Sequence, residues 1–303
     1  MPTIITGIGP QFHRFSTRSG KTIAITERGT NPRRPNNQDK LALWPGRLLI
    51  ADGMGGHAAG ETAAHLAVET ISSANPTPTA DSLKAAFQSA QQALLSAMQR
   101  DASLYGMGTT ATLAAIEGDN LHIAHIGDGR VYRATESGAC ERLTLDHSAA
   151  QCYLKQDPKI GRVRLPLSGD ELRSLDAGLA IHSAKNILTQ LLGGRPPEDP
   201  ETSRALPLAE WSAKKVEIDL YQYTLAAGDW LLLCTDGLWG PLGGSLADRL
   251  ASFRQQGLDI EAAANKLVAE ALALSGTSGD NMTLILYQHD NLTLRASCPT
   301  RDC

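Results

Sequence analysis

Two stretches of the chain run an apolar segment directly into an Asp-Gly pair. The first reads Leu-Leu-Ile-Ala before Asp52 and Gly53, and the second reads Leu-Leu-Leu-Cys-Thr before Asp236 and Gly237. An aspartate at the end of a buried strand is held rigidly, and the glycine after it allows a sharp turn and lets its own carbonyl approach a ligand. Two such carboxylates, far apart in sequence, are typical of a site that binds several divalent cations through oxygen.

Three further aspartates stand at the edges of strand-like segments. They are Asp39, Asp128 and Asp280. Any one of the five aspartates is best explained as a solvated turn residue, because Asp and Gly are common turn formers. All five together, with glycine at four of the junctions, favour a shared site at one end of a pair of sheets.

The chemistry of these side chains favours magnesium or manganese. The candidate ligands are hard oxygen donors without an accompanying His/Cys cluster, which disfavours zinc and copper. Two such ions can share a carboxylate and a water, whose pKa falls toward neutrality and yields a hydroxide nucleophile. That arrangement suits phosphoryl transfer to water, in which an arginine is expected to grip the phosphate. Arg34, on the loop before Asp39, is the candidate, and Arg33 is its rival.

Length and composition are those of a globular protein. The chain has 303 residues, a hydrophobic fraction of 42% and a net charge of −4, which gives no sign of a nucleic-acid partner. No apolar run approaches the length of a membrane span, and the N-terminus lacks the core of a signal peptide. Five cysteines without a CxxC spacing fit a reducing compartment. We expect a cytoplasmic monomer with no nucleic-acid and no membrane partner.

Several antiparallel strands interleaved with long amphipathic helices must position the aspartates, which is an α+β pattern. Hydrophobic periodicity and turn residues predict the elements, with Asp81 as the N-cap of the second helix. The predicted strands are residues 22–26, 39–44, 47–52, 110–116, 121–126, 130–134, 140–144, 215–220, 229–234 and 282–287, and the predicted helices are residues 61–72, 81–100, 182–192, 245–256 and 260–274.

No shift of composition divides the chain, so we predict one domain over residues 21–290. Residues 1–20 show no periodicity and are expected to form an N-terminal extension. Residues 148–180 are polar and irregular, which predicts a mobile flap or a surface insertion. Residues 291–303 are expected to form a C-terminal tail.

An ordered series of motifs resembles the metal-dependent protein phosphatase (PPM) family, the type-2C serine/threonine phosphatases, in their bacterial form. A lone Asp-Gly would carry no weight, whereas this series spans most of the chain in the order of the family and is highly specific. The motifs are Arg34-x-x-Asn37-Gln38-Asp39, Ala51-Asp-Gly-Met-Gly-Gly-His57-x-x-Gly60-Glu61, Gly108-Thr-Thr-Ala111, Gly127-Asp-Gly-Arg130-Val-Tyr132, Leu143-Thr-x-Asp-His-Ser148, Asn186-x-Leu-Thr189, Cys234-Thr-Asp-Gly237 and Gly279-Asp-Asn281.

The resemblance implies a four-layer α-β-β-α sandwich of two antiparallel sheets flanked by helices, with the metals at one end. Asp52 would bridge the two catalytic ions, and the carbonyl of Gly53 would bind the second ion. Asp236 and Asp280 would bind the first ion, and Asp39 would hold metal-bound waters.

The resemblance also implies a third, weaker ion near Asp128, and a flap at residues 148–180. The usual Gly-Asp-Ser-Arg of the family reads Gly-Asp-Gly-Arg here, which changes the packing at Gly129. Eukaryotic relatives place a histidine directly after Asp-Gly, where this chain has Met54, and His57 lies three residues on. His57 either protonates the departing alkoxide or packs at the start of a helix, and both readings stay open.

The main hypothesis is a Mg²⁺- or Mn²⁺-dependent protein serine/threonine phosphatase, in which a binuclear centre activates a bridging water for in-line attack. Its partners would be phosphorylated proteins, and it would counteract a Ser/Thr kinase. Two alternatives are a metal-dependent phosphoesterase of small molecules or lipids and an inactive, phosphatase-like sensor module. The complete set of aspartates argues against the sensor.

Overall fold

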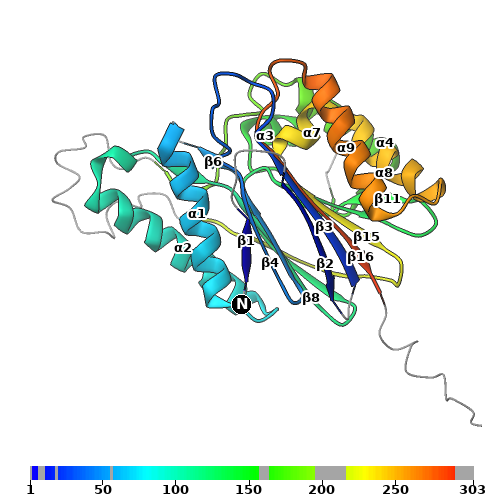
Figure 1. Cartoon of the computed structure of the whole chain (residues 1–303), viewed down its shortest axis with the longest axis horizontal. Helices are drawn as coiled ribbons and strands as arrows, with labels where there is room; N and C mark the ends of the chain where they lie inside the picture. The colour runs from blue at the N-terminus through cyan, green and yellow to red at the C-terminus, as the bar shows by residue number, and fades with distance from the viewer. Residues whose placement is uncertain are drawn as a thin grey trace, which may run out of the picture.

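Two antiparallel sheets pack face to face in this computed structural model, which describes residues 2–5, 11–17, 20–54, 57–156, 164–194 and 216–290 (Figure 1). The first sheet has the order β1-β4-β5-β8-β9-β14, with strands β1 (Thr3–Ile5), β4 (Lys40–Trp44), β5 (Arg47–Ala51), β8 (Ala111–Glu117), β9 (Asn120–Ile126) and β14 (Asp219–Thr224).

The second sheet has the order β12-β11-β10-β15-β16-β3-β2. Its strands are β2 (Gln11–Thr17), β3 (Gly20–Glu27), β10 (Arg130–Ala134), β11 (Cys140–Arg142), β12 (Leu167–Ser168), β15 (Trp230–Cys234) and β16 (Met282–His289). A small third sheet joins β13 (Leu192–Gly193), β7 (Gly108–Thr109) and β6 (Gly53–Met54).

Helices cover the outer face of each large sheet. The first sheet packs against α1 (His57–Ala74) and α2 (Ala80–Arg100). The second packs against α4 (Gly169–Ile181), α7 (Asp236–Leu242), α8 (Leu246–Gln255) and α9 (Ile260–Ser275) (Figure 1). The expected four-layer α-β-β-α arrangement, an α+β fold, is therefore confirmed. None of the described helices is both long and apolar enough to cross a membrane.

The strand pattern explains the layers, because successive side chains of a strand face opposite sides of its sheet. In β5, Leu48 and Ile50 join the core between the sheets, whereas Leu49 and Ala51 face α1 and α2. The strand β15 is apolar throughout, Trp-Leu-Leu-Leu-Cys, and it is covered on both faces.

The structure adds elements to two segments for which none were predicted, and one predicted helix is wrong. Within residues 1–20, β1 pairs with β4 and β2 pairs with β3, so the described part of the N-terminal extension adds strands to both sheets. Residues 148–180 contain α3 (Ala149–Gln156) and α4, which packs through Leu172, Leu175 and Leu179. Residues 182–192 form turns and a bridge between Ser148 and Leu188 in place of a helix.

The other predicted helices and strands are present, and their ends are displaced from the predicted ends by no more than about the length of one helical turn. The helix α1 begins at His57, four residues before the expected start at Glu61. Thr79, and not Asp81, caps α2, since its side chain accepts a hydrogen bond from the amide of Ser82. The predicted tail at residues 291–303 lies outside the described part of the chain.

Candidate active site

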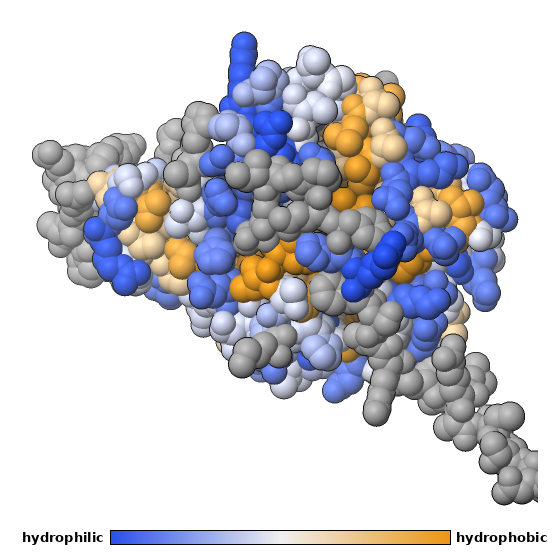
Figure 2. Space-filling model, in the orientation of Figure 1, coloured by the Kyte–Doolittle hydropathy of each residue, from blue (hydrophilic) through white to orange (hydrophobic). Residues whose placement is uncertain are grey.

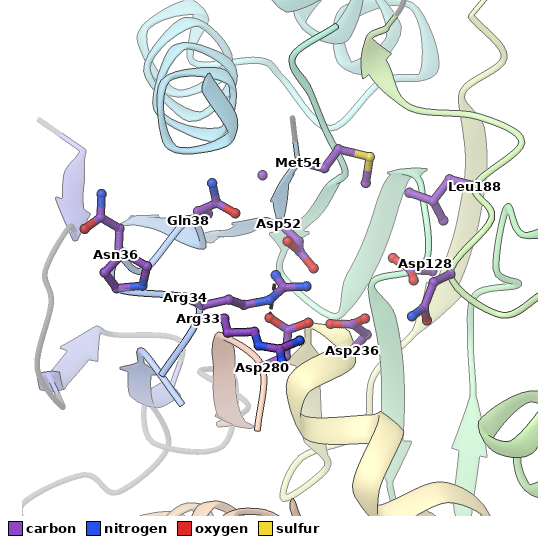
Figure 3. Close-up of a pocket in the computed structure, with 13 residues that line it drawn as sticks. Arg33, Arg34, Asn36, Gln38, Asp52, Met54, Asp128, Leu188, Asp236 and Asp280 are labelled. Atoms are coloured by element: carbon purple, nitrogen blue, oxygen red, sulfur yellow. Dashed lines mark ion pairs between the residues drawn. The ribbon is translucent and has the colours of Figure 1, made fainter. Parts of the chain in front are cut away.

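Four of the five aspartates line one pocket at an edge of the sandwich. Antiparallel pairing brings the end of β5, the β9–β10 turn, the end of β15 and the start of β16 to this edge. Their side chains point into a cavity of about 360 Å³ (Figure 3). It is lined by Arg33, Arg34, Pro35, Asn36, Gln38, Asp52, Gly53, Met54, Asp128, Asn186, Leu188, Asp236 and Asp280.

Asp39 supports this pocket from within the sandwich and is not among its lining residues. It precedes β4 and is 1% exposed. Its Oδ2 accepts a hydrogen bond of 2.8 Å from the hydroxyl of Thr235, the residue before Asp236. Thr235 in turn accepts a hydrogen bond from the amide of Thr283 on β16. Asp39 and Asp236 are thus joined through the end of β15.

Both Asp-Gly turns require glycine, because other backbone lies directly against them. A Cβ on Gly53 would lie 2.0 Å from the carbonyl oxygen of Gly60 on α1, and one on Gly237 would lie 2.0 Å from the carbonyl oxygen of Asn281. The first contact packs the start of α1 onto the turn after Asp52. The second packs the start of α7 onto the turn that carries Asp280.

The five carboxylates are deprived of solvent and repel one another. Burial, followed by the charges of the neighbouring aspartates, raises the pKa of Asp52 and Asp236 well above the ordinary value. Burial raises the pKa of Asp128 to about 7 and that of Asp39 to about 6. Burial also raises the pKa of Asp280, against the opposing effect of Arg34. A bound cation would oppose these shifts and favour the ionised carboxylates.

The donor set fits divalent cations that prefer oxygen. Oδ1 of Asp39 and Oδ1 of Asp236 are buried and have no hydrogen-bond partner in the structure. Carboxylate oxygens and the Gly53 carbonyl are ligands of Mg²⁺ and Mn²⁺. No three His, Cys, Asp or Glu side chains of the described residues already surround one point as a metal cage. Mg²⁺ and Mn²⁺ commonly take backbone and water oxygens as further ligands.

Two arginines line the pocket, and a buried lysine follows Asp39. Nη1 of Arg34 lies 2.7 Å from Oδ1 of Asp280 (Figure 3). Arg33 lines the same wall. Sequence reasoning missed Lys40, whose buried ammonium donates to the carbonyl of Asn37 and pairs with Glu61 at 3.2 Å. The signal in the sequence was the position of Lys40 directly after Asp39, because a buried lysine needs a partner for its charge.

Asp128 is supported by a buried ionic network behind the pocket. Nε1 of Trp239 donates to the carbonyl of Asp128 at 3.0 Å, and the guanidinium of Arg130 stacks 3.6 Å from the centre of the Trp239 ring. Arg130 pairs with Asp146 at 2.8 Å and with Asp176 at 3.2 Å.

The second arginine of this network, Arg142, also pairs with Asp146 and Asp176. The hydroxyl of Tyr132 donates to Asp176 at 2.6 Å. Two guanidinium groups therefore balance two buried carboxylates, as burial of charge requires. Because Asp176 belongs to α4, the network fastens the α4 part of the predicted flap to the second sheet.

The histidines of the β-meander are structural. His125 is fully buried, with Nδ1 at 2.9 Å from the hydroxyl of Thr112 and Nε2 at 3.0 Å from the carbonyl of Leu145. His147 accepts a hydrogen bond from the amide of Gly127 at 3.2 Å and lies 3.1 Å from Asp219. Their rings, with centroids 5.0 Å apart, brace the turn that carries Asp128.

The structure describes His57 only in part. The backbone of His57 begins α1, but its side chain lies outside the described part, so its role stays a prediction. Asn186 and Leu188 also line the pocket, and sequence reasoning gave them no role. The motif Asn186-x-Leu-Thr189 was the signal that could have found them.

Fold and site together define a class, the α-β-β-α sandwiches that carry a carboxylate-rich metal site at one edge. Residues 32–160 match the family model described as protein phosphatase 2C. The serine/threonine protein phosphatase PstP of Mycobacterium tuberculosis is 29% identical over 277 residues, which cover 90% of this chain and 44% of PstP. The serine/threonine phosphatase Stp of Listeria monocytogenes is 26% identical over 270 residues, which cover 85% of this chain and 92% of Stp.

Solved structures agree with these relatives. The crystal structure of Mycobacterium tuberculosis PstP/Ppp has a TM-score of 0.67 at 27% identity and covers 89% of this chain and 98% of its own. The PstP catalytic domain in complex with two manganese ions has a TM-score of 0.65 at 27% identity, with coverage of 89% and 97%. This chain is similar, in sequence and in fold, to bacterial serine/threonine phosphatases of the protein phosphatase 2C type. It spans 44% of the length of PstP.

Proposed function

We propose that the protein is a Mg²⁺- or Mn²⁺-dependent phosphatase of phosphoserine and phosphothreonine in proteins. One observation carries the proposal. Four aspartates with raised pKa values and two arginines share one cavity of about 360 Å³. Carboxylates hold cations, an arginine binds an anion, and a phosphoryl group between them would meet both requirements of hydrolysis.

Each aspartate would have its own role in binding the metal ions. Asp52 would bridge two ions, with Asp236 and Asp280 on the first and the carbonyl of Gly53 on the second. Asp39 would orient metal-bound waters. When bound, the ions supply a water acidic enough to attack phosphorus and positive charge for the phosphoryl oxygens. A third ion would lie near Asp128, whose own carbonyl is fixed by Trp239.

Arg34 is the phosphate ligand of this proposal, and Arg33 remains its rival. Both line the cavity from the same loop. Arg34 is the one whose guanidinium reaches a candidate metal ligand, Asp280. A group beside a metal ligand is close enough to contact a phosphoryl oxygen on that metal, and a guanidinium can do so through two hydrogen bonds.

Protein substrates are favoured by the relatives, which are named serine/threonine phosphatases. A lipid phosphoesterase is less well supported, because charged and amide side chains dominate the lining of the cavity. An inactive sensor would have no need of every aspartate. Phosphorylated proteins and an opposing Ser/Thr kinase are therefore the proposed partners.

The remaining parts of the proposal are a monomeric state and a location in the cytoplasm. The described cysteines, Cys140, Cys152 and Cys234, are free thiols, which suits a reducing compartment.

The test is cleavage of a panel of phosphothreonine and phosphoserine peptides, beside p-nitrophenyl phosphate and phospholipid headgroups, with Mn²⁺, Mg²⁺ or EDTA. Metal-dependent release of phosphate from the peptides supports the proposal. Cleavage of headgroups alone supports the lipid alternative, and no cleavage of any substrate with metal present supports the sensor.

A further inference from the structure

The loop that carries Arg34 has no helix or strand of its own between β3 and β4. Its path is set instead by the turn before β16. The amides of Thr30 and Asn31 both donate to the carbonyl of Gly279, at 3.1 and 3.0 Å. The hydroxyl of Thr30 accepts from the amide of Gly279 at 3.0 Å and donates to the carbonyl of Gly276 at 2.5 Å. The beginning of the loop is thus fastened to residues 276–279.

A single side chain, Asn281, fastens the rest of the loop. It is 2% exposed. Its Nδ2 donates to the carbonyl of Arg28 at 2.7 Å and to the carbonyl of Asn36 at 3.1 Å. Its Oδ1 accepts from the amide of Gln38 at 2.9 Å. These three points lie on both sides of Arg34, so one carboxamide closes the loop around it.

The approach of the two backbones leaves no room for an alternative path. Gly29 has a φ of +81°, and a Cβ there would lie 2.0 Å from the carbonyl oxygen of Asp280. Across the loop, Nη1 of Arg28 donates to the carbonyl of Arg34 at 3.0 Å. Asn281 is therefore the centre of a compact unit in which the arginine loop and the turn of Asp280 hold each other.

We propose that Asn281 is a positioning residue, which holds the loop so that the Arg34 guanidinium meets the phosphate of the substrate. This role rests on the proposed phosphatase function. Asn281 adjoins the metal ligand Asp280, so a single turn places both the cation and the arginine. Only a carboxamide supplies two donors and an acceptor in this geometry. A carboxylate of the same shape would face the carbonyls of Arg28 and Asn36 without a proton to donate.

The test compares Asn281→Ala, Asn281→Asp and Gln91→Ala with the wild type. Gln91 is a matched control, because it is also a buried carboxamide that clasps main chain, at both the amide and the carbonyl of Gly193, and it does not contact the arginine loop. We expect both Asn281 variants to raise the KM for a phosphothreonine peptide about tenfold or more, the size of a lost charged hydrogen bond. The kcat should change much less, and the KM of Gln91→Ala should stay within about twofold.

A second readout does not depend on activity. Trypsin cleaves after Arg33, whereas the bond after Arg34 precedes Pro35 and resists it. Limited proteolysis of the metal-free proteins, followed by mass spectrometry, should show faster cleavage after Arg33 in the Asn281 variants than in the wild type or in Gln91→Ala. In the double variant Asn281→Ala/Arg34→Ala, the KM should equal that of Arg34→Ala within about twofold, because both changes remove one function.

Three results would overturn the role of Asn281. They are an unchanged KM in Asn281→Ala, an equal effect of Gln91→Ala, or KM effects that multiply in the double variant. If the wild type cleaves no phosphopeptide, the proposed function fails. Tryptic cleavage after Arg33 then still reports whether Asn281 orders the loop, so the two failures are distinguishable.

Discussion

Arg34 and Asp280 both line the cavity and form an ion pair, with Nη1 and Oδ1 2.7 Å apart. The two side chains are 43% and 30% exposed. The pair places the positive charge of the Arg34 guanidinium at a site where burial raises the pKa of every aspartate. If Asp280 ligated a metal ion, as proposed, its oxygens would be less available to Arg34, and the guanidinium would be free to bind an anion in the cavity.

Replacing Arg34 should therefore weaken substrate binding. In Arg34→Ala, we expect the KM for a phosphothreonine peptide to rise about tenfold or more, with a smaller change in kcat, because a charged hydrogen bond to phosphate is lost. Arg33→Ala is the matched control, since it removes an equal charge from the same wall. Steady-state kinetics at saturating Mn²⁺ decide, and a larger effect in Arg33→Ala would exchange the two assignments.

Asp236→Asn should abolish Mn²⁺-dependent hydrolysis and leave the fold intact. The change removes a carboxylate that is held at a raised pKa, so the Tm of the metal-free protein should stay the same or rise. Mn²⁺ should raise the Tm of the wild type and have a smaller effect on the variant. Differential scanning fluorimetry with Mn²⁺ and with EDTA measures both effects. A variant that retains most of its activity would remove Asp236 from the ligands.

His57 can be tested through the leaving group. A general acid is needed for a serine or threonine alkoxide, whereas nitrophenolate leaves with little protonation. If His57 is the acid, His57→Ala should lose far more kcat with a phosphopeptide than with p-nitrophenyl phosphate. Equal losses with the two substrates would instead point to packing at the start of α1.

His125 should make the fold sensitive to acid. Burial, and then the neighbouring His147, lower the pKa of His125 to about 3 from 6.5. Below pH 6.5 the unfolded chain binds a proton that the folded protein refuses, so stability falls as the pH drops from 6.5 toward 3. The groups around the ring are Thr112, the carbonyl of Leu145, Asp146 and Asp219.

In His125→Gln, the decline of the unfolding free energy between these pH values should be shallower than in the wild type. Urea denaturation of the metal-free proteins at several pH values gives the comparison. Asp219, whose pKa is lowered to about 2, contributes in the same direction and is unchanged in both proteins. Parallel pH profiles would show that His125 is not responsible.

The buried ionic network predicts a large loss of stability in Asp176→Ala. Removal of this carboxylate leaves Arg130 and Arg142 partly uncompensated inside the fold, at a loss of about 3–5 kcal/mol. Asp248→Ala is the control, since Asp248 pairs with Arg173 at a surface where it is 53% exposed, and such pairs contribute about 0–1 kcal/mol. Urea titrations that gave similar losses for both variants would contradict this account.

The meeting of the aspartates at one edge could be predicted, because each aspartate is marked by its own neighbours in the sequence. Each of Asp52 and Asp236 follows an apolar strand and precedes a glycine, and strand ends in an antiparallel sandwich meet at a few edges. The contacts of Asn281 could not be predicted in the same way. They join residues more than two hundred positions apart, and no periodicity encodes which carbonyls a buried amide will reach.

The errors in secondary structure have physical reasons as well. β1 and β2 are stabilised by pairing with β4 and β3, so their formation depends on neighbours that a local pattern does not reveal. The helix α4 did carry a signal, since Leu172, Leu175 and Leu179 recur at helical spacing. The polar residues around them obscured that spacing.

The space around Gly129 limits which residues can replace it. A Cβ there would lie 2.7 Å from Oγ1 of Thr112, and that hydroxyl is held by Nδ1 of His125 at 2.9 Å. Rotation of Thr112 would remove the hydrogen-bond partner of Nδ1 of the buried His125. A serine at position 129 would therefore fit only beside a smaller residue at position 112, so we expect these two positions to tolerate substitution only together.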